Sequence, residues 1–444
     1  MKKLYTALSC LVLVLLLGVG LFALLDKDAT FSASENRALK KRPAPTLSAL
    51  LDGSYVTSFD AYFSDTFPTR EKLLSTNRSL NGFYYFSALA GETGPAIAID
   101  FNTNAANGGE ALPVASEQTT PDPEPSESGS EESTEPTEAP VVETLGTVLL
   151  IGDRAIDCAV ARYEKIDEYA EAINQIADAL GSDVRTISIA VPNSAEFYTP
   201  EEYHSGAYSQ KNMIDYCYSK LNSNVYHVDA YSSIAAHTEE YLYFRTDHHW
   251  TQLGAYYAYL AFCDTMGFTA EPLDKFETGQ YDDFLGSLYT YVKDYPQSKV
   301  LAENPDTLYF YRPFVEAKAR YYSDTTLSDP GKIGVISYIQ ENVSNKYLCY
   351  LGGDHPVVVV NTDVEGPVCL LIKESYGNAF VPWLTSHYSR IVVIDPREFN
   401  REGKPELNLA AFAEEQGIDD CIVLNYPIML SSKAYIDWMY RMLD

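Results

Sequence analysis

Short apolar runs and helical periods alternate along the C-terminal two thirds of the chain. The strand candidates are TVLLIG, VRTISIAV, VYHVD, VCLLIK, RIVVID and CIVLN, which suit strands buried on both faces. Helical periods lie between them, as in YEKIDEYAEAINQIADAL, TQLGAYYAYLAFCDTMG, AAFAEEQG and AYIDWMYRML. This alternation predicts an α/β fold with a mostly parallel sheet covered on both faces. Active sites in such sheets lie at the carboxyl ends of the strands.

The alternation predicts a main domain over residues 146–444. Residues 268 to about 345 break the pattern and hold many tyrosines, so we expect an insertion near the site. Ahead of this domain, SFDAYFSDTF and REKLLSTNRSLNGFYYF predict two short amphipathic helices broken at Pro68. Residues 30–103 are too few for a separate core, and we expect them to pack on the main domain.

The N-terminus predicts a membrane anchor over residues 1–29. Lys2 and Lys3 precede an uncharged apolar run from Leu4 to Leu25, which is long enough to cross a hydrocarbon core of about 30 Å. Positive charge before the run places the N-terminus inside and the main domain outside the cell. Because no small-x-small site directly follows the run, we favour a retained single-pass anchor over a cleaved signal peptide.

The composition predicts a spacer ahead of the main domain and excludes nucleic acid as an expected partner. Residues 104–145 hold ten acidic residues, six prolines and no Lys or Arg, which predicts a disordered spacer, either a stalk or an unconstrained insertion. The whole chain has 62 acidic against 32 basic residues and a net charge of −30, so nucleic acid is not an expected partner. The seven cysteines form no CxxC pair, and we expect neither a metal nor another cofactor.

The strongest local signal is the segment RTDHHWT at residues 245–251. In an extended segment Asp247 and His249 share a side while His248 points the other way, so Asp247 is suited to hold His249 as a general base. Two alternatives stay open here. A metal site would need a further ligand, which no HExxH motif or cysteine pair supplies, and a polar network capping the next helix also suits these residues.

Ser375 is the candidate nucleophile. It follows the apolar run VCLLIK and precedes a helical segment, so it is expected on a strand-to-helix turn whose N–H groups could stabilise an oxyanion; taken alone, it also suits an ordinary helix N-cap. Three further residues are candidates for substrate binding or oxyanion stabilisation. They are Tyr376 after the serine, Asn193 after another buried strand, and Arg154, which stands in LLIGDR where many serine esterases have the nucleophile.

These motifs together resemble the bacterial DHHW family, named for the tetrapeptide at residues 247–250. The likeness also covers ENRALKKRPAP, FSDTFPTR, LLIGDR, TQLGAYYAY and LLIKESYGNAFVPWLTSHYSRIVVIDPREF. The family is similar to alginate-type polysaccharide O-acetylation proteins, which implies a three-layer α/β/α SGNH hydrolase-like domain. The order of Asp-x-His before a later Ser then implies Ser375 as nucleophile, His249 as base and Asp247 as its orienter. One departure is Glu374, because related blocks have Asp before the serine.

The resemblance implies an extracellular, membrane-anchored serine acyltransferase or esterase, acting with an acetyl group on cell-surface polysaccharide. A transferase would need a separate membrane protein that exports the acyl donor, because the chain has no visible donor-binding motif. The alternative is a non-catalytic module for glycan binding or envelope assembly. A distance within about 4 Å between His249 and Ser375 would favour catalysis.

Overall fold

The computed structural model describes residues 31–32, 37–38, 40–46, 54–67, 142–145, 148–159, 161–200 and 209–443. The chain divides into two compact units, residues 1–92 and 93–444. The predicted anchor and most of the predicted spacer lie outside the described residues. Within the described ranges, no helix has the length and apolar character needed to cross a membrane.

The first unit contains one helix and one pair of short strands. Strands β1 (Phe31–Ser32) and β2 (Arg37–Ala38) pair antiparallel. Helix α3 (Ser54–Thr66) confirms the first of the two predicted helices, and the second lies outside the described residues. In α3, aromatic side chains recur four residues apart, so the rings of Tyr55 and Phe59 stack with centroids 5.9 Å apart. The predicted packing of residues 30–103 on the main domain stays a prediction.

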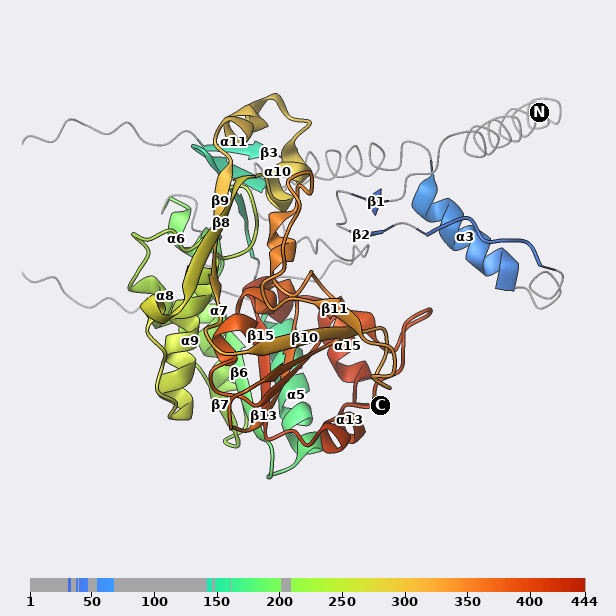
Figure 1. The fold of residues 1–444 in the computed structure, drawn as a ribbon. Coiled ribbons are helices and arrows are strands. Elements are labelled where there is room, and N and C mark those ends of the chain that lie inside the picture. Colours follow the sequence, from blue (N-terminus) through green and yellow to red (C-terminus); the bar gives the residue numbers. More distant parts are fainter. Residues whose placement is uncertain are drawn as a thin grey trace, which may run out of the picture. The chain divides into compact units, whose positions relative to one another are not determined.

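The second unit is built on a sheet of eight strands in the order β11-β10-β12-β14-β13-β15-β6-β7 (Figure 1). The last five strands of this order run parallel, as predicted, and β12, β10 and β11 extend the sheet with antiparallel pairing. Strands β13 and β15 lie at its centre and are almost wholly buried, which explains their unbroken apolar runs. The bounds are β6 Arg185–Ala190, β7 Val225–His227, β10 Ala317–Tyr322, β11 Gly331–Ile333, β12 Val357–Thr362, β13 Val368–Lys373, β14 Arg390–Ile394 and β15 Asp420–Asn425.

The run TVLLIG does not join this sheet, so its predicted place was wrong. It forms β4 (Val148–Ile151) in a separate antiparallel sheet with β3 (Val142–Leu145) and β5 (Arg154–Asp157). The chain reverses between β4 and β5 at Gly152, whose φ of 58° suits glycine. Strand β3 also shortens the predicted spacer, because residues 142–145 find a pairing partner in β4.

The predicted insertion at 268–345 is only partly separate from the main sheet. Strands β8 (Glu277–Phe284) and β9 (Asp306–Arg312) form a hairpin of their own. Two short helices connect them, α10 (Ser287–Val292) and α11 (Lys299–Glu303). The remainder contributes β10 and β11, which belong to the main sheet because their backbones pair with β12 and with each other.

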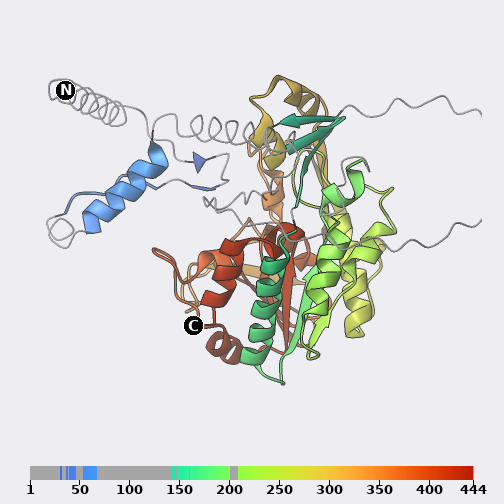
Figure 2. The ribbon, with the colours of Figure 1, turned by 180° about the vertical axis from the view of Figure 1, so that it is seen from behind.

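The helices form two groups around the main sheet. Helix α5 packs with α7, α13 and α15, while α9 packs with α8 and α12. Figure 2, which turns the molecule by 180° from Figure 1, shows α5, α13 and α15 over the face of the sheet that is then nearer to the viewer. Four of these helices confirm the predicted periods. The bounds are α5 Tyr163–Leu180, α7 Gln210–Ser219, α8 Ala230–Ala235, α9 Gln252–Met266, α12 Val381–Leu384, α13 Leu409–Gln416 and α15 Lys433–Arg441, with shorter α6 Ser194–Tyr198 and α14 Pro427–Leu430.

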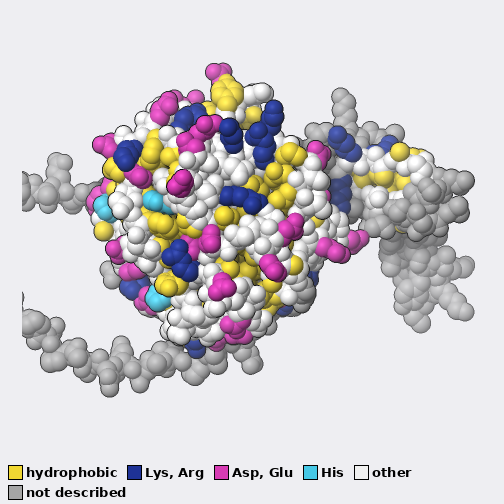
Figure 3. Space-filling view, turned by 60° about the horizontal axis from the view of Figure 1, so that its bottom comes forward, with side chains coloured by type: hydrophobic (Ala, Val, Ile, Leu, Met, Phe, Trp, Pro, Cys, Tyr) yellow, Lys and Arg dark blue, Asp and Glu magenta, His cyan; other side chains and the backbone are white. Residues whose placement is uncertain are grey.

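The surface of the second unit mixes charge of both signs. Figure 3 shows acidic and basic side chains interspersed with hydrophobic ones over the face that it draws. Six described cysteines are free thiols, and five of them are buried. The five buried cysteines therefore act as small apolar residues of the core.

Candidate active site

Ser375 lies where the central strand β13 turns into a short 3-10 helix, η5 (Ser375–Ala379). Glu374 precedes it as the N-cap residue, and its side chain accepts a hydrogen bond from the Tyr376 backbone N–H. Because β14, β13 and β15 are parallel, this turn lies at the carboxyl edge of the sheet. The strand-to-helix turn predicted from the sequence is therefore present.

Asp247 and His249 lie on a bend just before helix α9. A single antiparallel bridge between Tyr243 and Trp250 closes the bend, and Thr251 caps the helix by accepting a bond from the Gly254 N–H at 3.2 Å. The indole N–H of Trp250 donates to the backbone oxygen of Tyr376 at 3.0 Å. This bond ties the DHHW segment to the turn that carries Ser375.

The three predicted triad side chains come together. The Oγ atom of Ser375 lies 2.7 Å from Nε2 of His249, and Nδ1 of His249 lies 2.5 Å from Oδ1 of Asp247. Asp247 and His249 are buried, at 3 % and 6 % exposure. A carboxylate next to Nδ1 holds the proton there, which leaves Nε2 as the acceptor for the serine hydroxyl.

The surroundings of the triad hold Asp247 ionised. Burial alone would raise the pKa of Asp247, but the facing His249 imidazole and its hydrogen bond lower it well below the usual range. The second oxygen, Oδ2, accepts the backbone N–H of Ser287 at 2.7 Å. On the other side, the His249 ring stacks on Tyr347 with centroids 3.8 Å apart, and the Tyr347 hydroxyl donates to the Ser375 carbonyl at 3.1 Å.

His248 lies beside His249, and the predicted opposite orientation was wrong. Their ring centroids are 3.8 Å apart, because the segment bends and so does not alternate like a strand. Nδ1 of His248 lies 2.6 Å from Oγ of Ser287. Burial and the neighbouring His249 lower the pKa of His248 to about 4, against the opposing effect of Asp247 and Asp157. His248 is thus a neutral neighbour of His249 at pH 7, and its Nδ1 lies against Ser287.

Sequence reasoning missed the residues that hold the DHHW segment from the β8–β9 insertion. Asp306, at the start of β9, accepts bonds from the backbone N–H groups of Arg245 and Thr246 at 3.0 and 2.8 Å. Gly286 packs so closely that a Cβ atom there would lie 2.2 Å from Cβ of Asp247. These residues carry no local sequence signal, because their partners at residues 245–247 are about 40 to 60 positions away in the sequence.

The three further candidates lie close to these segments, but their donors already have partners. The Tyr376 N–H donates to Oε2 of Glu374 at 2.9 Å, and its ring stacks on Tyr426. The Asn193 amide donates to the carbonyl of Asp157 at 3.1 Å. The Arg154 guanidinium donates to the carbonyls of residues 243 and 244 and lies over the Tyr198 ring. The Tyr376 N–H, the Asn193 amide and Nη1 of Arg154 are thus engaged within the protein.

Three atoms able to bind a metal ion lie within 4.8 Å of one another, one each from Asp247, His248 and His249. Both ring nitrogens of His249 are already engaged, one by Asp247 and one by Ser375. A metal ion bound through His249 would therefore break one of the two bonds of the triad.

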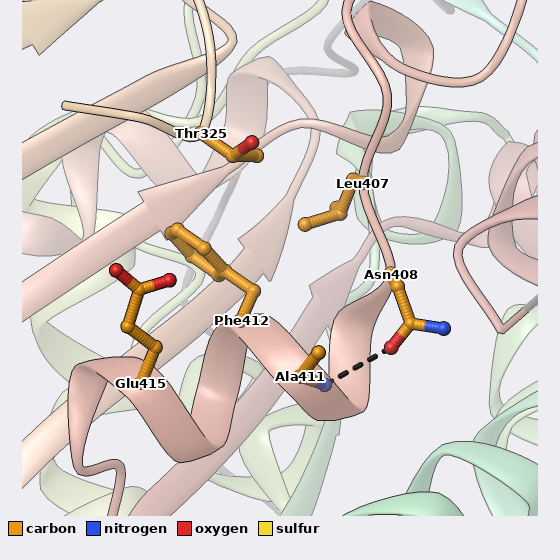
Figure 4. Close-up of a pocket in the computed structure, with 6 residues that line it drawn as sticks. All are labelled: Thr325, Leu407, Asn408, Ala411, Phe412 and Glu415. Carbon is orange, nitrogen blue, oxygen red and sulfur yellow. Dashed lines mark hydrogen bonds between the residues drawn. The ribbon is translucent and has the colours of Figure 1, made fainter. Parts of the chain in front are cut away.

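A small pocket lies elsewhere on the second unit, beside helix α13 (Figure 4). It has a volume of about 160 Å³ and includes none of the predicted site residues. Its lining residues are Thr325, Leu407, Asn408, Ala411, Phe412 and Glu415.

Comparisons with known proteins agree with this architecture. The DHHW protein family matches residues 107–394. A DHHW family protein from Eubacterium siraeum DSM 15702 is 27 % identical, with a TM-score of 0.61 over 69 % of this chain and 99 % of that chain. Bacillus cereus PatB1 is similar in fold, at 19 % identity and a TM-score of 0.53 over 67 % of this chain and 99 % of that chain. The structure of the same protein with a sulfonyl adduct matches at 18 % identity and a TM-score of 0.52, over 67 % of this chain and 97 % of that chain. No curated protein matches the chain. From the family match and the DHHW segment it includes, the chain belongs to the DHHW family.

Proposed function

We propose that this protein is a serine acyltransferase or esterase with Ser375 as its nucleophile. The observation that carries the proposal is the 2.7 Å contact between Ser375 Oγ and His249 Nε2, with Asp247 on the other ring nitrogen. This arrangement matches the requirement that a nucleophile contact a base that a third group orients. It supports catalysis over the non-catalytic glycan-binding or envelope-assembly module.

Each residue has a defined part in the proposed reaction. His249 accepts the hydroxyl proton while Ser375 Oγ forms a bond to the acyl carbon, and Asp247 stabilises the imidazolium that results. His249 then returns the proton to the departing alcohol or carrier. The acyl group leaves Ser375 in a second, equivalent step, to a sugar hydroxyl in a transferase or to water in an esterase. These steps use side chains alone and require no cofactor.

The proposed acceptor is a cell-surface polysaccharide and the proposed acyl group is acetyl. The acceptor class rests on the resemblance to polysaccharide O-acetylation proteins in the order of Asp247, His249 and Ser375. The apolar run at residues 4–25 supports a single-pass anchor that holds a three-layer SGNH hydrolase-like domain outside the cell. A transferase of this kind would receive its acyl group from a separate membrane protein.

A serine-reactive fluorophosphonate tests the nucleophile directly. In the full-length protein, we expect labelling at Ser375 that is lost in Ser375→Ala and strongly slowed in His249→Ala. Ser328→Ala, at an exposed loop serine, serves as the matched control and should label normally. Folded protein that does not label at Ser375 would contradict the proposal. Acetyl release from an aryl acetate, with and without an oligosaccharide acceptor, then separates an esterase from a transferase.

A further inference from the structure

Asp354 contacts both flanks of the turn that carries Ser375. Its Oδ1 accepts hydrogen bonds from Nζ of Lys373 and from Nδ2 of Asn378, each at 2.8 Å. Lys373 is the last residue of β13, two positions before the serine, and Asn378 lies in η5, three positions after it. One carboxylate oxygen therefore joins the strand and the helical segment between which Ser375 is held.

The other oxygen of Asp354 extends this network to the neighbouring strand. Oδ2 accepts a hydrogen bond from Nη2 of Arg397 at 2.6 Å, and Arg397 donates to both oxygens of Asp395, the residue after β14, at 2.9 and 2.6 Å. Lys373 lies 3.6 Å from the same Asp395. Because the side chains of Lys373 and Arg397 are only 2 % and 12 % exposed, water screens these pairs little. Removing Asp354 would leave both cations to share Asp395, on the side of the neighbouring strand.

Two glycines bring the chain to this position. Gly352 and Gly353 have φ angles of 69° and 104°, which favour glycine, and they lie between η4 (Lys346–Cys349) and β12. Because β12 runs antiparallel to β14, its first residues meet the carboxyl ends of β14 and β13. Helix η4 carries Tyr347, whose ring stacks on His249. This connection thus contacts the base at one end and the nucleophile turn at the other.

The two partners of Asp354 are in close contact with the backbone of the turn. A Cβ atom at Gly377 would lie 2.5 Å from Cβ of Lys373, so a displaced Lys373 side chain would move the backbone two residues after Ser375. Among the described residues, the other side-chain atom of Asn378, Oδ1, is buried without a hydrogen-bond partner. The bond to Asp354 is therefore what orients the Asn378 amide.

Resting on the proposed function, we propose that Asp354 is a positioning residue for the nucleophile. It fixes Lys373 and Asn378 at a single oxygen. By doing so it keeps Ser375 Oγ at 2.7 Å from Nε2 of His249. Acylation needs the attacking oxygen aligned with both its base and the acyl carbon, and a displacement of about 1 Å can slow such a step by about 10²-fold.

The test measures acylation by an aryl acetate in full-length Asp354→Ala, per folded molecule. We expect the maximal rate constant for acylation to fall by about 10- to 100-fold, because the nucleophile loses its alignment. The half-saturating ester concentration should change by less than about twofold, because the lost interaction acts on the chemical step and not on ester binding. An unchanged rate constant would overturn the proposal.

Asp420→Ala is the matched control for loss of a buried ion pair. Asp420 begins β15 at the opposite edge of the sheet and accepts three side-chain bonds, two from Arg185 and one from Tyr388. Asp354 also accepts three. The control should lower stability at least as much, because the Asp420 side chain is 0 % and that of Asp354 is 31 % exposed, yet it should leave the acylation rate constant within about twofold. Equal losses of rate in the two variants would overturn the proposal.

A double-mutant cycle with Asn378→Ala tests whether Asp354 acts through the turn. Asn378→Ala removes one bond to Asp354 and leaves its ion pairs in place, so we expect a smaller loss of acylation rate, about three- to tenfold. The combined variant should lose little more than Asp354→Ala alone, because both changes remove the same bond. Losses that simply multiply would contradict the proposal. If Asp354→Ala does not fold, an unchanged rate in Asn378→Ala overturns the proposal by itself.

Fluorophosphonate labelling at Ser375 separates this inference from the function on which it rests. Without labelling of the wild-type protein, the proposed function fails and the inference fails with it. If the wild-type protein is labelled and Asp354→Ala is labelled at the same rate, only the part assigned to Asp354 fails.

Discussion

The adjacent histidines of the DHHW segment have different partners. His249 bridges Asp247 and Ser375, whereas Nδ1 of His248 lies 2.6 Å from Oγ of Ser287. We expect His249→Ala to lower kcat/KM for an acetyl ester by about 10²–10⁴-fold, because the serine proton then has no acceptor. His248→Ala should lower it much less. Steady-state kinetics of both variants check this, and an equal loss in the two would show that the base is misassigned.

Glu374 links stability to pH. Because burial raises its pKa in the folded protein from 4.5 to about 7, the folded state keeps a proton that the unfolded state releases over this interval. Stability contributed by Glu374 is therefore present below about pH 4.5 and is lost as pH rises to about 7. The free energy of unfolding of Glu374→Gln relative to wild type should rise between pH 4.5 and 8, by up to about 3 kcal/mol. Denaturant unfolding at both pH values measures this difference, and a constant difference would contradict the raised pKa.

At the scale of elements, the β8–β9 hairpin holds the DHHW segment in place. Asp306 on β9 is fully buried and accepts bonds from the backbone of Arg245 and Thr246. Asp306→Ala should lower the free energy of unfolding by about 3 kcal/mol or more, because several buried donors lose their acceptor. We also expect a loss of kcat, since Asp247 follows directly. Asp282→Ala, at an exposed position of the same hairpin, should change stability by less than about 0.5 kcal/mol.

The N-terminus of helix α10 approaches Asp247 too closely for any side chain at Gly286. An added Cβ would lie 2.5 Å from Oδ2 of Asp247, so Gly286→Ala must displace either the carboxylate or the backbone that donates to it. We expect a loss of kcat beyond the loss of folded protein. Gly334→Ala creates a comparable clash, 2.6 Å from the carbonyl oxygen of Ile336. That control should lower stability but leave the activity per folded molecule unchanged; equal activity losses would argue against a specific effect on Asp247.

At the scale of the whole molecule, we expect the acidic segment at residues 104–141 not to be needed for catalysis. Residues 104–141 contain nine acidic residues and no basic ones, and the described site uses none of them. Deleting this segment should leave kcat/KM for a small acetyl ester within about twofold, because a neutral ester carries no charge for the acidic residues to attract or repel. Kinetics of the full-length protein and the deletion variant measure the ratio. A large loss would mean that the segment contributes to the site.

The alternation of apolar and polar positions predicted the parallel strands and four helices because each of these patterns is local. A run such as VCLLIK must be buried on both faces, and the 3.6-residue period at 163–180 specifies one apolar helix face. Pairing between distant segments is not local. For this reason the pattern placed β4 in the wrong sheet and treated β10 and β11 as part of an insertion.

The sequence by itself determined the central strands and the turn at Ser375, because strand periodicity and turn chemistry depend on neighbouring residues. It also predicted, with the resemblance to the DHHW family, that Asp247 and His249 would act with Ser375. Only the tertiary structure decided what surrounds the triad. Asp306, Gly286 and Tyr347 reach it from the segment between α9 and β12, and the orientation of His248 follows from a bend that alternation does not describe. The protonation state of Glu374 depends on the pairing of Lys373 and Arg397 with Asp354 and Asp395, because that pairing leaves no cation for Glu374. These ion pairs exist only once the chain is folded.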